Sequence, residues 1–263
     1  MVAPRLVEFA SVFVLALYAF FARPRLRDVL VIAAGAFLGE EICIRLYGAY
    51  QYSPAWSLFV DRVPVAVLCI WPAVVLSARA VAARLAPGRD PSGAALATGA
   101  IVLLDAALIE PVATQAGLWS WNLPGAFSVP PVAPFGWACY AFAAALVLAR
   151  LERAKRSATL SLGAPFAVAA LAHALILAGW WSALRWLQVA IPERAAVAAA
   201  VFSGAGLFIL ALRLPRLSWR DSAPRACASA VFAGLLVARP EPHLVAYAAC
   251  LAVPWLAVLD WRR

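Results

Sequence analysis

Carboxylic acid side chains stand at four positions inside long apolar stretches of this 263-residue chain. Glu40 and Glu41 lie late in one stretch, and Asp105 and Glu110 lie in the middle and outer half of another. A carboxylate near the centre of a bilayer is costly unless it is paired or protonated, so such a residue is a candidate functional group. A carboxylic acid that an apolar surround keeps protonated is also a strong proton donor. These four residues are therefore the candidate catalytic groups.

Each of these carboxyls has a structural interpretation beside the catalytic one. Glu41 lies four residues before Arg45, which is the spacing of an ion pair on one helix face. Glu110 precedes Pro111 and can bind backbone groups that a proline kink frees. Asp105 has no charged residue three or four positions away. Its partner must therefore come from another helix, or it must be protonated.

Two connections between the apolar stretches are rich in aromatic residues, proline and glycine. They run from Tyr47 to Arg62 and from Gly117 to Pro131. An interfacial aromatic belt accounts for part of this enrichment, but rigid, non-helical backbone at membrane depth is tolerated only where it is buried or lines a cavity. We therefore expect a cavity lined by aromatic side chains near the carboxyls. The candidate substrate-binding residues are Tyr50, Tyr52, Trp71, Trp119, Trp121 and Trp137.

The elements that position these residues follow from the composition. The chain is 65% hydrophobic and 13% charged, and its mean hydropathy is +0.87, which leaves too little polar material to cover a soluble globule. We predict an all-α polytopic membrane bundle of eight or nine spans that forms one domain over residues 1–263. The eighth predicted span is short for the roughly 20 residues that a crossing needs. The predicted spans are 6–22, 28–46, 63–85, 94–116, 132–150, 161–187, 195–213, 225–238 and 243–260.

The basic residues predict the orientation, because cytoplasmic loops carry the excess of Lys and Arg. With nine spans, one side of the bundle receives sixteen of them: Arg23, Arg25, Arg27, Arg79, Arg84, Arg89, Arg150, Arg153, Lys155, Arg156, Arg213, Arg216, Arg220, Arg225, Arg262 and Arg263. The other side receives six: Arg5, Arg45, Arg62, Arg185, Arg194 and Arg239. This alternation predicts that the N-terminus lies outside and the C-terminus lies in the cytoplasm.

The same composition argues against several classes of function. The net charge of +9 is spread among the loops, so we expect no nucleic-acid partner. The five cysteines lie singly in different apolar segments, which favours neither a disulfide nor a zinc site. Two histidines are too few for a membrane di-iron enzyme, and His173 is interpreted as a packing residue. The chain contains no G-x-S-x-G, Walker A or G-x-G-x-x-G pattern, so we expect no hydrolase nucleophile and no soluble cofactor.

Two stretches also carry a family resemblance. The first holds Glu40-Glu41, Tyr47 to Ser53, Val63-Pro64 and Trp71-Pro72; the second holds Asp105, Glu110 to Ala113, Gly117 to Trp121, Pro124-Gly125, Val129-Pro130 and Phe135 to Trp137. On these residues the chain resembles the carotenoid biosynthesis protein family over about residues 35–150. That family includes bacterial and archaeal membrane hydratases that add water across the terminal double bond of acyclic carotenoid ends, as in the bacterioruberin and myxol routes.

The resemblance implies a cofactor-independent hydratase that acts on a lipophilic polyene. Hydration of such an alkene needs a proton donor, a site that stabilises a tertiary carbocation, and a single water molecule. Intramembrane carboxyls and aromatic faces meet the first two needs. We favour Asp105 as the donor, with Glu110, Glu40 or Glu41 orienting water or accepting its proton. The polyene would enter laterally from membrane lipid, and other carotenoid enzymes are possible partners.

Two rival functions use the same residues. One is proton-initiated cyclisation or isomerisation of the same polyene, which needs the acid but excludes water. The other is a polyisoprenoid transporter or binding protein, in which the carboxyls relay protons. No long internal repeat is evident in the sequence, which weighs against the inverted-repeat transporters. Because 21 of the 22 basic residues are Arg, we expect a GC-rich bacterial source and therefore the cytoplasmic (inner) membrane.

Overall fold

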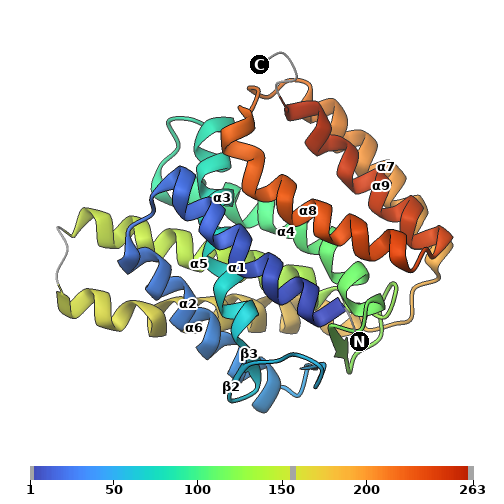
Figure 1. Cartoon of the computed structure of the whole chain (residues 1–263), viewed down its shortest axis with the longest axis horizontal. Helices are drawn as coiled ribbons and strands as arrows, with labels where there is room; N and C mark the ends of the chain where they lie inside the picture. The colour runs from blue at the N-terminus through green and yellow to red at the C-terminus, as the bar shows by residue number, and fades with distance from the viewer. Residues whose placement is uncertain (1–2, 155–157, 260–263) are drawn as a thin grey trace.

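The computed structural model describes residues 3–154 and 158–259, and these residues form a helical bundle with short strands in its connections (Figure 1). Lys155, Arg156, Arg262, Arg263 and the predicted end of the ninth span at Asp260 lie outside the described residues. The described helices are α1 (Ala3–Ala22), α2 (Leu26–Arg45), α3 (Val65–Leu85), α4 (Pro91–Gln115), α5 (Val132–Arg153), α6 (Ala158–Ser182), α7 (Glu193–Ala211), α8 (Trp219–Ala238) and α9 (Pro242–Val258). The predicted all-α class is confirmed.

Six of the described helices are long and apolar enough to cross a membrane, namely α1, α3, α4, α5, α6 and α7. The protein is therefore an integral membrane protein. Helix α2 is long enough but carries five charged residues. The apolar parts of α8 and α9 are shorter, at 222–238 and 242–258.

Two helices differ from the predicted spans by more than three residues at one end. Helix α8 begins at Trp219, six residues before the expected start, because Pro224 is accommodated near its N-terminal end and does not start the helix. Helix α6 ends at Ser182, and the rest of the predicted sixth span forms a separate 3₁₀ turn, η1 (Leu184–Leu187). The eighth segment is thus a continuous helix of 20 residues.

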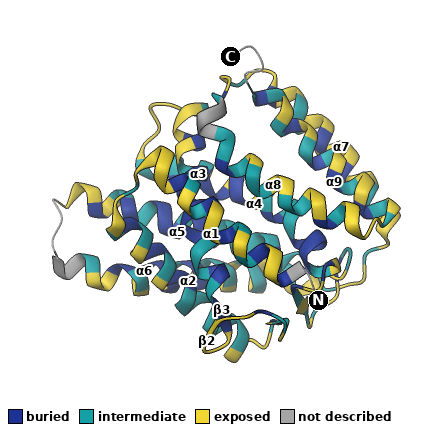
Figure 2. Ribbon diagram, in the orientation of Figure 1, coloured by how far each residue is buried: buried dark blue, intermediate teal, exposed yellow. Residues whose placement is uncertain are grey.

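Large apolar side chains cover the outside of the bundle. Phe9 on α1 is 78% exposed and Phe202 on α7 is 80% exposed, and exposed residues recur along the outer faces of the helices in Figure 2. Apolar exposure on this scale marks a surface that something other than water covers. In a membrane protein that cover is lipid. The core centres on α3, where Val75, Ala78 and Val81 are fully buried.

Two short antiparallel strands join the two aromatic connections at one end of the bundle. Strand β1 (Tyr50–Tyr52) pairs with β4 (Trp119–Trp121), with Tyr50 opposite Trp121 and Tyr52 opposite Trp119. Alternate residues of a strand point to the same face, and directly opposite residues share a face. These four aromatic side chains therefore lie together on one side of the ladder.

A tight hairpin follows each of these strands. After β1, strands β2 (Phe59–Val60) and β3 (Val63–Pro64) pair across a two-residue turn. After β4, a bridge between Ala126 and Val129 closes another two-residue turn. A Val-Pro pair ends both hairpins and leads into a helix, α3 in the first case and α5 in the second.

The segments α2–β1–hairpin–α3 and α4–β4–hairpin–α5 thus repeat the same order of elements, and we call them the two repeated units. This repeat in the order of elements is not a long repeat of the sequence. The similarity lies in the order and spacing of a few residues, with little identity between the helices that separate them. Both copies run in the same direction, so the repeat is parallel and differs from the inverted repeats of many transporters.

Candidate active site

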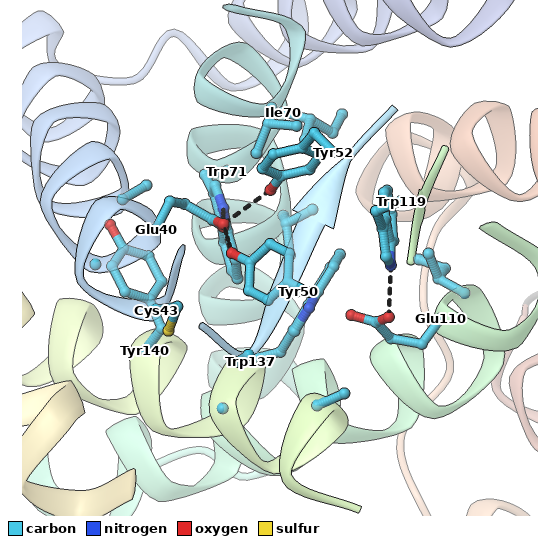
Figure 3. Close-up of a pocket in the computed structure, with 18 of the residues that line it drawn as sticks. Glu40, Cys43, Tyr50, Tyr52, Ile70, Trp71, Glu110, Trp119, Trp137 and Tyr140 are labelled. Carbon is cyan, nitrogen blue, oxygen red and sulfur yellow. Dashed lines mark hydrogen bonds between the residues drawn. The ribbon is translucent and has the colours of Figure 1, made fainter. Parts of the chain in front are cut away.

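A cavity of about 180 Å³ lies between the two repeated units (Figure 3). Both strands β1 and β4 line it, together with residues of α1 to α6 and α8. Two carboxyls reach it, Glu40 from α2 and Glu110 from α4, and all six predicted substrate-binding aromatic residues contribute to its wall. Asp105 and Glu41 do not line it.

Glu40 is held by three hydrogen-bond donors. The phenol groups of Tyr50 and Tyr52 both donate to its Oε2 atom, Tyr52 at 2.8 Å. The indole Nε1 of Trp71 donates to Oε1 at 3.0 Å. Tyr50 and Tyr52 come from β1 and Trp71 from α3, so the whole first unit is organised around this carboxyl.

Glu110 occupies the equivalent place in the second unit. It is 1% exposed, and its Oε2 atom accepts from the indole Nε1 atoms of Trp119 at 2.8 Å and of Trp121 at 2.9 Å. Trp137 of α5 is a further hydrogen-bonding neighbour of the same carboxyl.

The two carboxyls differ in what their neighbours can do with a proton. An indole N–H only donates, so the tryptophans around Glu110 favour the carboxylate anion. A phenol both donates and accepts, so Tyr50 and Tyr52 can serve Glu40 in either protonation state. Burial raises the pKa of the Tyr52 phenol well above its ordinary value, and the nearby Glu40 raises it further. Tyr52 therefore remains a neutral hydroxyl.

Aromatic rings stack around the space between the carboxyls. The ring centroids of Trp71 and Trp137 are 4.8 Å apart, those of Trp71 and Tyr140 are 4.6 Å apart, and those of Tyr50 and Trp121 are 4.7 Å apart. The face of an aromatic ring attracts a cation through its quadrupole. A cavity with such walls and two carboxyls can stabilise positive charge on a bound hydrocarbon.

The repeat is visible in the spacing of these side chains. Glu40 precedes the two tyrosines by ten and twelve residues, and Glu110 precedes Trp119 and Trp121 by nine and eleven. In each unit the tryptophan of the following helix lies seven residues after the proline of the Val-Pro pair. This pattern of Glu, aromatic-x-aromatic, Val-Pro and Trp is the sequence signal that would have revealed the repeat.

Comparison with known families gives the site a context. The family model described as carotenoid biosynthesis protein matches residues 5–203, which is well over half of the chain. The chain belongs to the carotenoid biosynthesis protein family. The match extends beyond the expected residues 35–150 and takes in both repeated units. No curated protein and no solved structure matches the chain significantly.

The matched region of the carotenoid biosynthesis protein family ends within α7, so α8 and α9 lie outside it. Helix α8 nevertheless adds Ala228, Val231 and Phe232 to the cavity wall. The wall that α8 provides is therefore a feature of this chain that the family match does not cover.

Asp105, the carboxyl expected to be the proton donor, lies away from the cavity and forms an ion pair with Arg225 of α8. Both side chains are 14% exposed. Arg225 also donates to Ser77 Oγ at 3.2 Å and lies over the Trp255 ring, 4.7 Å from its centroid. A guanidinium partner favours the carboxylate anion, which carries no proton to donate. The structure thus gives Asp105 a partner from another helix, the first of its two expected alternatives.

Glu41 also points away from the cavity. Its Oε2 atom accepts from Arg45 Nε at 2.6 Å, and its Oε1 atom accepts from the backbone N–H of Arg62 at 3.1 Å. This is the ion pair that the four-residue spacing indicates, extended to the hairpin of the first unit. Glu41 therefore links α2 to the loop, and the adjacent Glu40 serves the cavity.

Two cavity residues were missed or set aside in the sequence. Tyr140 of α5 donates to the Ile32 carbonyl and stacks on Trp71. His173 of α6 was interpreted as a packing residue, yet it lines the cavity. Neither belongs to a recognisable motif, so only their helical register in the folded bundle brings them to the site.

Residues with spacing suited to a metal ion occur elsewhere. Within the described residues, Glu193, Glu241 and His243 bring potential ligand atoms within 4.8 Å of one another. Glu241 already caps α9 by accepting from the backbone N–H groups of His243 and Leu244. That capping role explains its position without a metal.

Proposed function

We propose that this member of the carotenoid biosynthesis protein family is a hydratase that adds water to the terminal double bond of an acyclic carotenoid. The observation that carries this proposal is the pair of carboxyls, half-buried Glu40 and buried Glu110, that line one aromatic cavity. Such a cavity suits a reaction that passes through a carbocation. The family membership supplies the class of substrate, a long polyene.

Glu40 is the proton donor in this mechanism. Its proton moves to the CH carbon of the terminal double bond, the π electrons form the new C–H bond, and the positive charge falls on the dimethyl carbon. A water oxygen then donates an electron pair to that carbon. The oxonium group returns a proton to Glu40, so the product is a tertiary alcohol and the acid is regenerated.

Glu40 replaces Asp105 in this role because Asp105 is engaged in an ion pair with Arg225 and does not line the cavity. Glu40 fits better because Tyr50 and Tyr52 can bind it before and after it gives up the proton. The phenols then donate to the carboxylate that remains.

Glu110 supplies the opposite function, a fixed negative charge. In this mechanism Glu110 acts in the carboxylate form, which its indole donors favour, and in a low-dielectric cavity an anion strongly stabilises a carbocation that forms near it. The faces of Trp71 and Trp137 add to this stabilisation. The acid and the anion thus come from different units.

The experiment that tests this function is expression in a lycopene-producing bacterium with mass analysis of the pigments. Hydration adds one water for each end that reacts. Cyclisation or isomerisation changes the absorption spectrum and retention without changing the mass, and a transporter or binding protein changes neither. A panel of acyclic carotenoids that all return unchanged, with the protein inserted in the membrane, would overturn the proposal.

We further propose that the protein lies in the bacterial cytoplasmic membrane with both aromatic connections on the outer side and that the polyene enters laterally from lipid. The pairing of β1 with β4 supports a common side for these connections. Other carotenoid enzymes in the same membrane would supply the substrate and take the product.

Reporter fusions are expected to place the loops that begin near Arg23, Ala86, Arg150 and Arg213 in the cytoplasm, because these loops carry the basic excess. Fusions in the connection of residues 117–131 should report the outer side. Finding that connection on the same side as residues 150–156 would contradict the proposed orientation.

A further inference from the structure

His173 carries a buried nitrogen that nothing in the described part of the chain binds. The residue is 7% exposed, it lines the cavity from α6, and its Nδ1 atom has no hydrogen-bond partner among the described residues. A buried polar atom without a partner is costly, so such atoms usually bind a water or a ligand. The cavity is the place from which that partner can come.

The second ring nitrogen, Nε2, shows which kind of group Nδ1 needs. The Nε2 side of His173 is turned toward Gly39, and the imidazole bonds to the Gly39 backbone. In a neutral imidazole one nitrogen donates and the other accepts. With Nε2 donating to the Gly39 carbonyl, Nδ1 is an acceptor, and it requires an O–H or N–H donor.

The position of His173 relates this acceptor to the acid. Gly39 immediately precedes Glu40 on α2, and the ring of Tyr47 packs edge-on against His173 with centroids 5.4 Å apart. His173 therefore lies on the side of the cavity that contains Glu40. The rest of that wall is apolar or aromatic, with Ala172 and Ile176 beside His173 on α6.

We propose that His173 Nδ1 accepts a hydrogen bond from the water molecule that attacks the carbocation and so fixes the position of that water. This inference rests on the proposed hydration. The hydrogen bond turns a lone pair of the water oxygen toward the cavity, and no proton is transferred to His173. The new C–O bond forms at the dimethyl carbon, and the released proton returns to Glu40 as described above. The same nitrogen would hold the hydroxyl group of the product.

The test separates protonation of the alkene from capture of the cation. Purified protein in lipid vesicles is given lycopene in D₂O. His173→Phe keeps a ring of similar size but loses the acceptor, so hydrated product should fall about 10²-fold. The cation still forms and now loses a proton, so deuterium should accumulate in the recovered lycopene. His173→Asn can keep an acceptor near the position of Nδ1, so it should restore part of the hydration. If His173→Phe does not insert into the membrane, the His173→Asn variant provides the test of the inference.

His243→Phe is the matched control, because His243 is the other histidine of the chain and lies against Glu193 and Glu241, outside the cavity wall. It should leave hydration unchanged. The inference is overturned if His173→Phe hydrates like the wild type, or if it loses deuterium incorporation and hydration together while still folded. Failure of the wild type itself to form product or incorporate deuterium would instead overturn the proposed hydratase function.

Discussion

Glu40→Gln is expected to abolish formation of the hydrated carotenoid while leaving the protein inserted in the membrane. Glutamine keeps the size of the side chain and can still accept from Trp71, Tyr50 or Tyr52, but it cannot deliver a proton. General acid catalysis is typically worth about 10² to 10⁴-fold. Protonation of an unactivated alkene depends on the acid more heavily than most reactions, so the loss should reach the upper end of that range.

Glu41→Gln provides a closely matched control, since it is the same substitution at the next residue of the same helix. Glu41 binds Arg45 and the Arg62 backbone outside the cavity, so product formation should stay within a few-fold of wild type. Pigment per unit of inserted protein is the measurement. An active Glu40→Gln variant together with an inactive Glu110→Gln variant would assign the acid to Glu110. If neither Glu40→Gln nor Glu110→Gln lowers product formation, the proposed mechanism, in which a cavity carboxyl first protonates the alkene, is wrong.

Asp105→Asn should reduce stability far more than the intrinsic rate of reaction. The substitution leaves the Arg225 guanidinium inside the bundle without its carboxylate, and breaking one side of a buried ion pair costs about 3–5 kcal/mol. Activity should fall in proportion to the amount of folded protein. Thermal unfolding in detergent, with product measured per folded molecule, separates the two effects.

The double substitution Asp105→Leu with Arg225→Met tests the cause of that loss. Replacing both members of a buried pair by apolar residues is often neutral or stabilising, so the double variant should recover much of the stability. A stable Asp105→Asn protein that forms no product would show that Asp105 takes part in the chemistry and would contradict the present assignment.

The sequence was sufficient to predict the class of fold and eight of the residues that line the cavity, two carboxyls and six aromatic residues. Apolar periodicity located the helices, because a bilayer requires long apolar segments whatever their packing. The cost of burying a carboxylate pointed to Glu40 and Glu110, and the unusual aromatic and proline content pointed to the two connections. All of these signals are local in the chain.

The parts that could not be predicted depend on contacts between distant residues. Arg225 lies 120 residues after Asp105, so no spacing rule links them, and the preference for Asp105 as the acid followed from its missing local partner. The pairing of β1 with β4 likewise joins segments about 70 residues apart. His173 on α6 likewise meets its backbone partner, Gly39 of α2, across a long separation in the chain.

The parallel repeat has a consequence for how this site is assembled. In an antiparallel ladder, a local two-fold axis passes between the central residues of the paired strands, here Gln51 and Ser120. This axis relates the two paired strands, and each of the two units, which the connection at residues 86–90 joins, contributes one carboxyl. Two identical halves would place two equivalent carboxyls around the ligand. Tyrosines in one half and tryptophans in the other break that equivalence, and duplication followed by divergence would turn a symmetric pocket into one with an acid on one side and an anion on the other.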